Sequence, residues 1–448
     1  MNYIAYTIGP IYETIFHTLN KGDKTRRLKA GSYFFSYFMK KLLSEIATEF
    51  KILVPYAGED ALTKTEKIGF FHDRFIAISM LEKELIEKRF EEALHRVYDS
   101  LATEIGNGYT AQEVASSMEN HLLVASSSQL KQIDENAIVA INTILDSMEL
   151  ERRVVLHPGR SAIRTYQDKA VEEKKERVKT LEEIAKPMNY YAVVTADGDQ
   201  LGKKIRAIAT EDPSKMRELS YNLYRFFMEE EGVYGLTHHT FKGELIYAGG
   251  DDVLAFLPVK VGEQSCFDYV RQLQKRFETY MGEESSLSFG IKIVSYKYPL
   301  RNAIMRAFEL LGEAKALDGS NKIAIEVTKR SGQTMHTIHT LSHERYRYYE
   351  KLVKLLVLQK KIAIPHALHH TLSRYKDVIV ALYQTPHEGA SLDALFATIF
   401  NDERSEAVQN GLEAVKSYIE YVAPQTPQAF NQLFSDLSII KFLREDRK

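Results

Sequence analysis

The sequence contains one cysteine and no tryptophan among its 448 residues. A single thiol, Cys266, excludes an intramolecular disulfide, a cysteine-based zinc finger and a CxxC redox site, so we expect no zinc. A chain of this length does not need such cross-links, because it is long enough to bury a large apolar core. A reducing cytoplasm is the compartment that fits this use of cysteine.

Long apolar runs and an excess of one charge are also missing. No stretch approaches the roughly 18 to 20 apolar residues that a membrane helix needs, and the N-terminus lacks the basic and apolar regions of a signal peptide. The 59 basic and 61 acidic residues leave a net charge of −2, which produces no global field for nucleic acid. We therefore expect a globular protein without a membrane partner, in which basic patches act only locally.

Apolar periodicity and charge divide the chain into four expected regions. Residues 1–95 mix strands and helices in an α/β domain, and residues 96–187 are polar and helical, with a charged helix at 170–184. Residues 188–335 alternate strands with helices, and residues 336–448 are helical throughout. The chain is therefore expected to be an α+β protein.

The third region carries the clearest topology. Strands are expected at 190–196, 240–247, 253–257, 286–295 and, as the last one, 322–328, with helices between them except at a Gly-Gly hairpin. The order β-α-β-β-α-β is the ferredoxin-like, or split βαβ, plan. The spacing in residues 1–95 leaves open a second, diverged copy of the same plan.

Acidic residues occur at two points of this predicted sheet. Asp197 comes just after the buried strand at 190–196, and Asp251 and Asp252 follow the turn formed by Gly249 and Gly250. Ligands of open sheets collect at strand ends, and the first strand and the hairpin strands are central neighbours in this plan. We therefore expect Asp197 and the Asp251-Asp252 pair to meet.

Three carboxylates at one place repel each other unless a cation lies between them. Oxygen ligands with open coordination positions suit Mg²⁺ or Mn²⁺, and two such ions would activate a ribose 3′-hydroxyl and hold a leaving pyrophosphate. The sequence therefore predicts a phosphoryl-transfer site at Asp197, Asp251 and Asp252. An acidic surface turn is the alternative for the hairpin alone, and the pattern leaves open which of the two adjacent carboxylates is the main ligand.

Neighbouring residues are expected to bind the nucleotide. Gly198 allows a ligand to approach the backbone, and Gly202 allows a tight turn into the next helix. Lys315, late on a predicted helix, is expected either to contact substrate phosphates or simply to favour the helix dipole. Lys24, Arg26 and Arg27, with Lys29, form the best basic patch, which is read either as an RNA contact or as a solvated loop.

Three groups of histidines have spacings that suggest metal sites. His72-Asp73 has no companion ligands nearby in sequence that would make a metal-dependent HD nuclease. The groups His238-His239 and His366, His369, His370 have no companion cysteine. We interpret His72-Asp73 as a polar pair next to a strand, and the other two groups as histidines at the surface or at helix ends.

Several motifs in the same order resemble one known family. The two that surround the acidic residues are ADGDQLG at 196–202 and YAGGDDVLA at 247–255. The others are TIGP at 7–10, KTR at 24–26, AGSY at 30–33, DRF at 73–75, YKYPL at 296–300 and KRSG at 329–332. In these residues the chain resembles the large catalytic subunit of type III CRISPR effector complexes, specifically its III-B branch.

The resemblance implies a catalytic palm domain at 188–335 and a second, diverged palm-like domain at the N-terminus. It implies a subunit of a complex with crRNA and target RNA that converts ATP into cyclic oligoadenylate, with Asp197, Gly198, Asp251 and Asp252 at the metal ions. Gly249, Gly250 and Gly202 would lie at the nucleotide. Lys315 and Asn321 are similar to the Ala-Lys…Asn element of diguanylate cyclases.

The chain also departs from that family. The family's N-terminal HD nuclease domain and its cysteine-rich zinc site are missing from this sequence, so the resemblance implies no DNase activity. Some relatives without an HD domain resemble enzymes that join AMP to S-adenosylmethionine, and this product stays open. A non-catalytic scaffold and a free-standing cyclase stay open as well, although the intact Asp197, Asp251 and Asp252 argue against the scaffold.

Overall fold

The computed structural model describes most of the chain. The described residues are 1–9, 23–64, 69–150, 161–173, 177–211, 213–365, 367–384, 391–400, 405–425 and 427–444. The chain divides into two compact units. Unit 1 comprises Met1–Ile184, Ala196–Phe256 and Leu273–Ser286, and unit 2 comprises Ala185–Thr195, Leu257–Gln272 and Leu287–Lys448.

A four-stranded antiparallel sheet forms the N-terminal part of unit 1. Its elements in chain order are β1 (Asn2–Gly9), α2 (Lys24–Ile46), β2 (Lys51–Val54), β3 (Arg74–Ser79), α4 (Lys83–Ile105) and β4 (Glu119–Ser126). The strand order is β2-β3-β1-β4, and β1 is antiparallel to both of its neighbours. This is the split βαβ plan, so the diverged second copy that the sequence left open is present in the fold.

Residues 96–187 were expected to be helical, and this prediction is wrong at two places. Residues 119–126 form β4, which pairs with β1 from Asn2 opposite Ser126 to Gly9 opposite Glu119. The expected helix at 170–184 is not continuous, because residues 177–180 are not helical and the Lys179 amide donates to the Glu244 carboxylate at 3.1 Å. In both places a distant partner provides the hydrogen bond that a helix would have provided.

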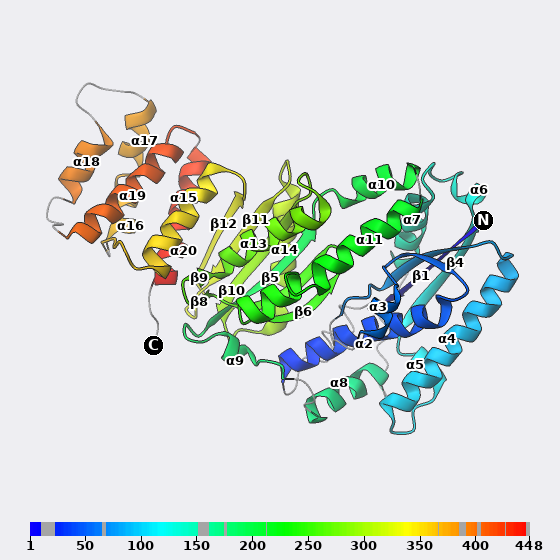
Figure 1. Cartoon of the computed structure of the whole chain (residues 1–448). Coiled ribbons are helices and arrows are strands. Elements are labelled where there is room, and N and C mark those ends of the chain that lie inside the picture. Colours follow the sequence, from blue (N-terminus) through cyan, green and yellow to red (C-terminus); the bar gives the residue numbers. More distant parts are fainter. Residues whose placement is uncertain are drawn as a thin grey trace. The chain divides into compact units, whose positions relative to one another are not determined.

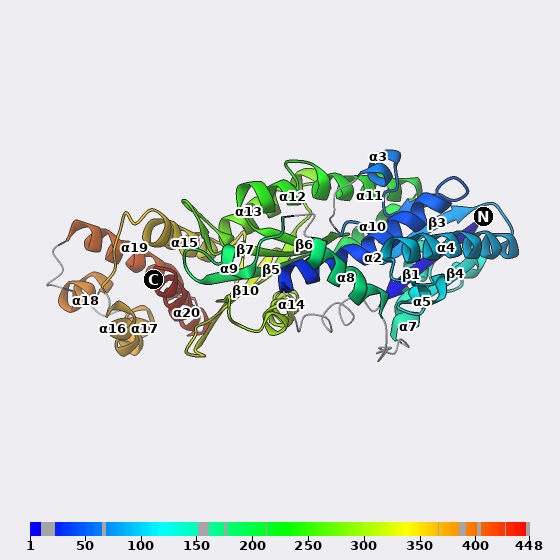
Figure 2. The ribbon, with the colours of Figure 1, turned by 90° about the horizontal axis from the view of Figure 1, so that it is seen from below.

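The remaining described helices before β5 have between 4 and 14 residues. They are α3 (Glu59–Thr63), α5 (Ala111–Ala115), α6 (Ser127–Leu130), α7 (Ala137–Leu150), α8 (Ala162–Glu173) and α9 (Leu181–Ile184). Among them α8 runs alongside α2 (Figure 2). The Gln167 side-chain amide on α8 donates to the Arg27 carbonyl oxygen at 2.9 Å, which joins the two helices.

A six-stranded sheet contains the predicted acidic residues. Its strands are β5 (Tyr190–Gly198), β6 (Glu244–Gly249), β7 (Asp252–Pro258), β10 (Leu287–Ser295), β11 (Lys322–Thr328) and β12 (Thr334–Thr340). The order is β12-β11-β10-β5-β7-β6. The four strands β10-β5-β7-β6 have the order of the ferredoxin-like plan, which confirms the predicted fold. Every residue of β10 is buried, as expected for a strand covered on both faces.

Helices link these strands. They are α10 (Leu201–Glu211), α11 (Pro213–Met228), α12 (Val233–Gly235), the π-helix η1 (Leu236–Thr240), α13 (Cys266–Met281) and α14 (Leu300–Ala316), and β8 (Lys260–Val261) pairs with β9 (Gln264–Ser265) in a separate sheet. The predicted start of the strand at residue 240 is therefore wrong, because Thr240 is the last residue of η1 and β6 begins at Glu244. Thr237 buries its side chain and donates to the Val233 carbonyl oxygen at 2.8 Å, which stabilises helix here.

Strand β12 corrects two further expectations. It follows β11 antiparallel, from Lys322 opposite Thr340 to Thr328 opposite Thr334. Residues 322–328 are therefore not the last strand, and residues 336–340 are not helical. Burial along β12 alternates, which is the period of a half-buried strand. The TMHTIHT sequence shows this alternation only weakly, because threonine and histidine are polar on both faces.

Helix α14 packs very closely on β10. A Cβ atom on Gly290 would lie 2.2 Å from the Ala307 carbonyl oxygen, so only glycine allows this approach. The Thr195 hydroxyl lies between the two elements, 3.2 Å from the Gly290 oxygen and 3.1 Å from the Ala307 oxygen. Leu310 and Ala314 of α14 are fully buried against Ala324 of β11.

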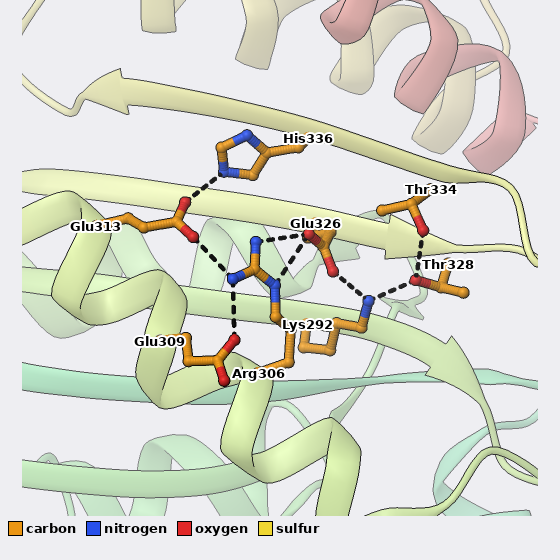
Figure 3. A network of polar contacts seen from close by, with 8 residues as sticks. All are labelled: Lys292, Arg306, Glu309, Glu313, Glu326, Thr328, Thr334 and His336. Carbon is orange, nitrogen blue, oxygen red and sulfur yellow. Dashed lines mark hydrogen bonds and ion pairs between the residues drawn. The ribbon is translucent and has the colours of Figure 1, made fainter.

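A polar network joins α14 to the edge of the sheet (Figure 3). Arg306 pairs with Glu326 at 2.7 Å and with Glu313 at 2.7 Å, and Glu313 contacts His336 of β12 at 3.1 Å. Lys292 of β10 pairs with Glu326 from the other side. Burial lowers the pKa of Lys292, although Glu326 opposes this effect. The network satisfies two buried charges that would otherwise destabilise the sheet.

The C-terminal helices follow β12. They are α15 (Glu344–Leu352), the π-helix η2 (Val353–Leu358), α16 (Leu368–Arg374), α17 (Lys376–Gln384), α18 (Leu392–Ile399), α19 (Glu406–Val422) and α20 (Pro427–Arg444). Helices α15, α19 and α20 pack side by side next to β12 (Figure 1). Asp436 of α20 lies 3.0 Å from the His339 ring, and the Tyr418 hydroxyl donates to the same carboxylate at 2.5 Å. None of the described helices is long and apolar enough to span a membrane.

A buried ion pair joins α2 to β6 within unit 1. Lys29 Nζ lies 2.9 Å from Glu244 Oε1, and the two side chains are only 5% and 2% exposed. The other carboxylate oxygen accepts from the Lys179 amide. Both charges are removed from water, so each depends on its partner for stability.

We expect Lys29→Met to destabilise the fold by about 3–5 kcal/mol, because the Glu244 carboxylate would remain buried without a cation. Urea unfolding followed by circular dichroism measures this change. The double variant Lys29→Met/Glu244→Leu should recover most of the loss. The exposed pair Lys83–Glu87 provides the control, since Lys83→Met should cost less than about 1 kcal/mol. Equal losses at both lysines would contradict the prediction.

Candidate functional site

Asp197 lies near the carboxyl end of β5. The sequence placed it just after the strand, whereas the structure places it inside, as the second-last residue. Residues 190–196 of β5 are buried, and Asp197 is the first half-buried side chain of the strand. The strand therefore carries an acidic group from the core to the point where solvent begins.

The hairpin of β6 and β7 has a two-residue loop. Gly249 is the last residue of β6 and pairs with Asp252, the first residue of β7, so the loop consists of Gly250 and Asp251 rather than two glycines. Gly250 has a φ of +68°, which glycine adopts without strain and other residues rarely do. Asp251 is thus the turn residue and Asp252 the strand residue, and both are half-buried.

The turn meets the end of β5 at Gly198. A Cβ atom on Gly198 would lie 2.7 Å from Asp251 Oδ2 and 3.0 Å from Asp251 Cβ. The Asp251 carboxylate therefore occupies space that is open only because residue 198 has no side chain. The structure brings Asp251 to the residue that follows Asp197, as the sequence predicted for these two elements.

A segment of the N-terminal region lies against the same hairpin. The Ala248 amide donates to the Gly69 carbonyl oxygen at 3.3 Å, and the Phe71 amide donates to Ser36 Oγ of α2 at 2.7 Å. A Cβ atom on Gly250 would lie 2.3 Å from Cε1 of His72. The His72 ring therefore packs on the turn, although the sequence marked this residue only as part of a strand-adjacent pair.

His72 contributes no positive charge at neutral pH. Burial lowers the pKa of its imidazole from the usual 6.5 to about 4. The carboxylates of the turn are therefore not neutralised by this ring. A cation from solution would provide that compensation.

Asp199, the second acid of the ADGDQLG motif, is held by Ser286. The Asp199 amide donates to the Ser286 carbonyl oxygen at 2.8 Å, and the Ser286 hydroxyl donates to Asp199 Oδ2 at 2.6 Å. Gln200 follows with a φ of +55°, and its carbonyl oxygen accepts from the Lys203 amide at 2.9 Å. Ser286 therefore holds the loop between β5 and α10, a role that the sequence did not indicate.

Gly202 does not have the role that was expected of it. The tight turn into α10 is made by Gln200, and no atom lies within 4 Å of a Cβ built on Gly202. Steric crowding therefore gives no reason for glycine at this position. Its expected contact with a nucleotide stays a prediction.

Lys315 and Asn321 belong to unit 2. Lys315 is exposed in the last turn of α14, where a cation favours the helix dipole. Asn321 has a φ of +61° just before β11, and its carbonyl oxygen accepts from the Leu341 amide at 2.8 Å. Asn321 thus has a structural role at the start of β11, and a role of either residue in binding nucleotide stays a prediction.

The basic patch on α2 is mostly engaged inside unit 1. Arg26 is 9% exposed and pairs with Asp23, and Arg27 pairs with Asp168 at 2.5 Å. Lys29 pairs with Glu244, and only Lys24 is exposed. The reading as a solvated loop is wrong, because these residues form the first turns of a helix. An RNA contact stays a prediction, with Lys24 as its most accessible member.

The other histidine groups have structural contacts. His238 accepts from the Leu245 amide at 3.4 Å, and its ring packs at a tilt against Tyr234, with 4.5 Å between the ring centroids. His369 contacts the Ser438 hydroxyl at 2.8 Å. His366 lies outside the described residues. These contacts agree with the structural interpretation of both groups.

The donors at the turn are suited to a hard cation, but the described residues contain no complete metal cage. Within the described ranges, no group of three or more His, Cys, Asp or Glu side chains is arranged to hold a metal ion. The feature that suits a metal ion is the position of the Asp251 carboxylate oxygen. It lies against the backbone of Gly198, where a Cβ atom would otherwise be. Asp197, Asp251 and Asp252 are the acids that would hold Mg²⁺ or Mn²⁺ at this end of the sheet, with remaining positions open to substrate oxygens and water. Their role as metal ligands stays a prediction.

Comparison with known proteins identifies two parts of the chain. Residues 190–324 match the family described as Cas10/Cmr2, second palm domain, and residues 3–103 match CRISPR-associated protein Cmr2, N-terminal. The chain is 32% identical over 215 residues to the CRISPR system Cmr subunit Cmr2 of Pyrococcus furiosus. That match covers 42% of this chain and 24% of the relative, so the chain spans about a quarter of that protein's length.

Solved structures share the fold at low identity. A type III-B Cmr-beta structure in the apo state matches with a TM-score of 0.60 and 12% identity, over 100% of this chain and 82% of the other. A Csm1-Csm4 cassette in complex with cA4 matches with a TM-score of 0.55 and 14% identity, over 99% of this chain and 70% of the other. Both likenesses extend over nearly the whole chain and concern the fold.

The contact between Gly250 and His72 is testable by a double-mutant cycle. We expect Gly250→Ala to destabilise the protein by more than about 2 kcal/mol, because alanine is strained at this φ and its Cβ would overlap the ring. In a His72→Ala background Gly250→Ala should cost only the strain of a left-handed backbone at alanine, about 1–2 kcal/mol. Thermal unfolding of the four proteins measures the coupling. Strictly additive effects would show that the ring does not pack on the turn.

Proposed function

Because this chain belongs to the Cas10/Cmr2 family of CRISPR proteins, we propose that it is the nucleotide-polymerising subunit of a type III-B effector complex. In this proposal it joins ATP molecules through 3′-hydroxyl attack on an α-phosphate and releases pyrophosphate. The product is a cyclic oligoadenylate messenger, and the complex also contains crRNA, target RNA and further protein subunits.

The observation that carries the proposal is the contact between Asp251 and Gly198. It brings a carboxylate of the YAGGDDVLA hairpin to the end of β5, directly after Asp197. Two acidic motifs that lie far apart in the chain therefore meet at one end of a palm-type sheet. A site of this kind matches the chemistry of phosphoryl transfer, which depends on positioning and on charge neutralisation.

Each residue of the site has a definite task in this proposal. Asp197, Asp251 and Asp252 would hold a divalent cation, which would supply Lewis-acid activation and neutralise phosphate charge. Gly198 leaves room for the Asp251 carboxylate at the end of β5. Gly250 sets the direction of the turn, and the neutral His72 ring keeps the turn in place without competing for the carboxylates.

The solved relatives support a nucleotide as substrate. One Csm1-Csm4 cassette was solved in complex with cA4, and its fold is the fold of this chain. We therefore propose ATP as the substrate and Mg²⁺ or Mn²⁺ as the metal. A product that joins AMP to S-adenosylmethionine uses the same 5′-activated nucleotide, so product analysis distinguishes the two reactions.

The direct test incubates the chain, assembled with its complex and cognate target RNA, with ATP and Mg²⁺, with and without S-adenosylmethionine. We expect cyclic oligoadenylate by mass spectrometry in both reactions, and none after the metal is removed with a chelator. Asp251→Asn preserves the shape of the turn and removes its charge, so we expect activity to fall at least about 100-fold, as for the loss of about 3 kcal/mol. Full activity of Asp251→Asn would refute this site, and an S-adenosylmethionine conjugate would replace the proposed product.

The space above Gly198 provides a second, steric test. Gly198→Ala should abolish turnover, because the new Cβ would overlap the Asp251 carboxylate and displace it. Gly312→Ala is the matched control, since its Cβ meets nothing within 4 Å on the exposed face of α14. We expect the control to keep its activity and to gain about 0.5–1 kcal/mol in stability. Unchanged turnover in Gly198→Ala would show that the contact is not needed.

A further inference from the structure

Unit 2 contains a groove of about 530 Å³ between the start of α13 and the helices α15 and η2. Its charged lining residues are Asp268, Arg271, Arg347, Glu350, Lys351 and Lys354. Its floor is apolar and includes the buried residues Phe267 and Leu358. The groove therefore combines an apolar floor with four basic and two acidic side chains at its walls.

Three of the four cations lie along one wall and face solvent. Arg347, Lys351 and Lys354 are exposed and follow each other at a spacing of four and three residues, so they share one face of the helix. Among the described residues, no hydrogen bond or ion pair engages the side chain of Arg347 or Lys351. Arg271 on the opposite wall is 60% exposed and pairs with Asp268 at 2.8 Å and with Glu350 at 3.7 Å. Arg347 and Lys351 are therefore the cations available to an anionic ligand.

The two acids cancel only part of this charge. Asp268 is used inside α13, where its carboxylate pairs with Arg271 at 2.8 Å and accepts from the Ser265 amide at 2.8 Å. Burial raises the pKa of Glu350 to about 7, although Arg271 and Lys354 oppose this effect. At neutral pH the Glu350 carboxyl is therefore partly protonated, and the groove has a net positive charge.

We propose that this groove binds the phosphate backbone of single-stranded RNA. A row of exposed cations matches successive phosphates of one strand. The lining offers no exposed aromatic ring for base stacking, because Phe267 is only 2% exposed, so the groove recognises the backbone and not the sequence. Anion binding rests on the groove itself, whereas the choice of RNA over an acidic protein segment rests on the proposed function. None of the groove residues belongs to the proposed nucleotide site.

Fluorescence anisotropy with a labelled oligouridine of about 15 nucleotides tests the proposal on the full chain. Affinity is measured between about 50 and 200 mM salt. Arg347→Gln/Lys351→Gln should weaken binding and reduce the slope of log affinity against log salt by about 1.4, since each lost contact to a single strand accounts for about 0.7. Arg301→Gln/Arg374→Gln removes the same charge from exposed positions of unit 2 outside the groove, and should leave the slope unchanged.

Glu350 provides an independent readout. It faces Arg271 and Asp268 of α13 and Lys354 of η2, with Arg347 and Lys351 on its own helix. Phosphates would raise the pKa of Glu350 further, so binding takes up a proton and tightens as the pH falls through about 7. Glu350→Gln should remove this pH dependence and bind more tightly than the unaltered chain at about pH 8, where the native carboxylate is charged.

Two results would overturn the proposal. One is an equal salt slope in the groove variant and its control. The other is displacement of the RNA by polyglutamate as readily as by unlabelled oligouridine, which would assign the groove to an acidic protein segment. Asp251→Asn serves as the reference for the nucleotide site and should bind RNA unchanged. The binding assay needs no turnover, so a failure of the proposed catalysis and a failure of this groove are observed separately.

Discussion

The position of β6 within unit 1 depends on the buried pair of Lys29 and Glu244. Glu244 is the first residue of β6, and its carboxylate is held by the Lys29 ammonium and the Lys179 amide. Further along the strand, Ala248 bonds to Gly69, and beyond its last residue His72 packs on Gly250. The N-terminal region thus contacts the strand at its start, near its end and at its turn. A charge pair with so little exposure tolerates little displacement, because a separated charge would remain without water.

This arrangement explains how an acidic turn is kept in a fixed place. Like charges at the end of a sheet favour separation or protonation, and the turn itself has only two loop residues. The β5 end accepts the Asp251 carboxylate because Gly198 has no side chain, and the neutral His72 ring lies beside the turn without forming an ion pair there. The chemistry proposed for the site depends on that geometry, since phosphoryl transfer needs positioned charge more than it needs proton transfer.

The motifs of the site were readable from the sequence because glycine and acidic residues are informative at strand ends. The buried run at 190–196 and the GGDD turn predicted β5, the hairpin and the split βαβ order, and the structure confirms them. Asp197, Asp251 and Asp252 were also identified in this way as candidate metal ligands. Their neighbours His72 and Ser286 were not, because their roles come from contacts with residues far away in the chain. No local period marks a histidine that will pack on a distant turn.

The failures have the same cause. Strand β4 was taken for helix because its short apolar run at 122–125 lies in a region of otherwise polar sequence. It is a strand because β1 provides its backbone partners. Gly202 was expected to make a turn that Gln200 makes. Arg26 and Lys29 were read as part of an RNA contact or of a solvated loop, whereas both are buried in ion pairs on a helix. In each case local composition was consistent with more than one environment, and packing selected one of them.

The sequence by itself determined the topology of the palm-type sheet, the hairpin and the identity of its acids, because these follow from strand periodicity and from the backbone freedom of glycine. The tertiary structure alone decided which carboxylate lies over Gly198, which cations are paired, and where exposed cations gather into a groove. Those outcomes depend on burial and on contacts between residues that lie far apart in the chain, and a linear pattern does not contain either quantity.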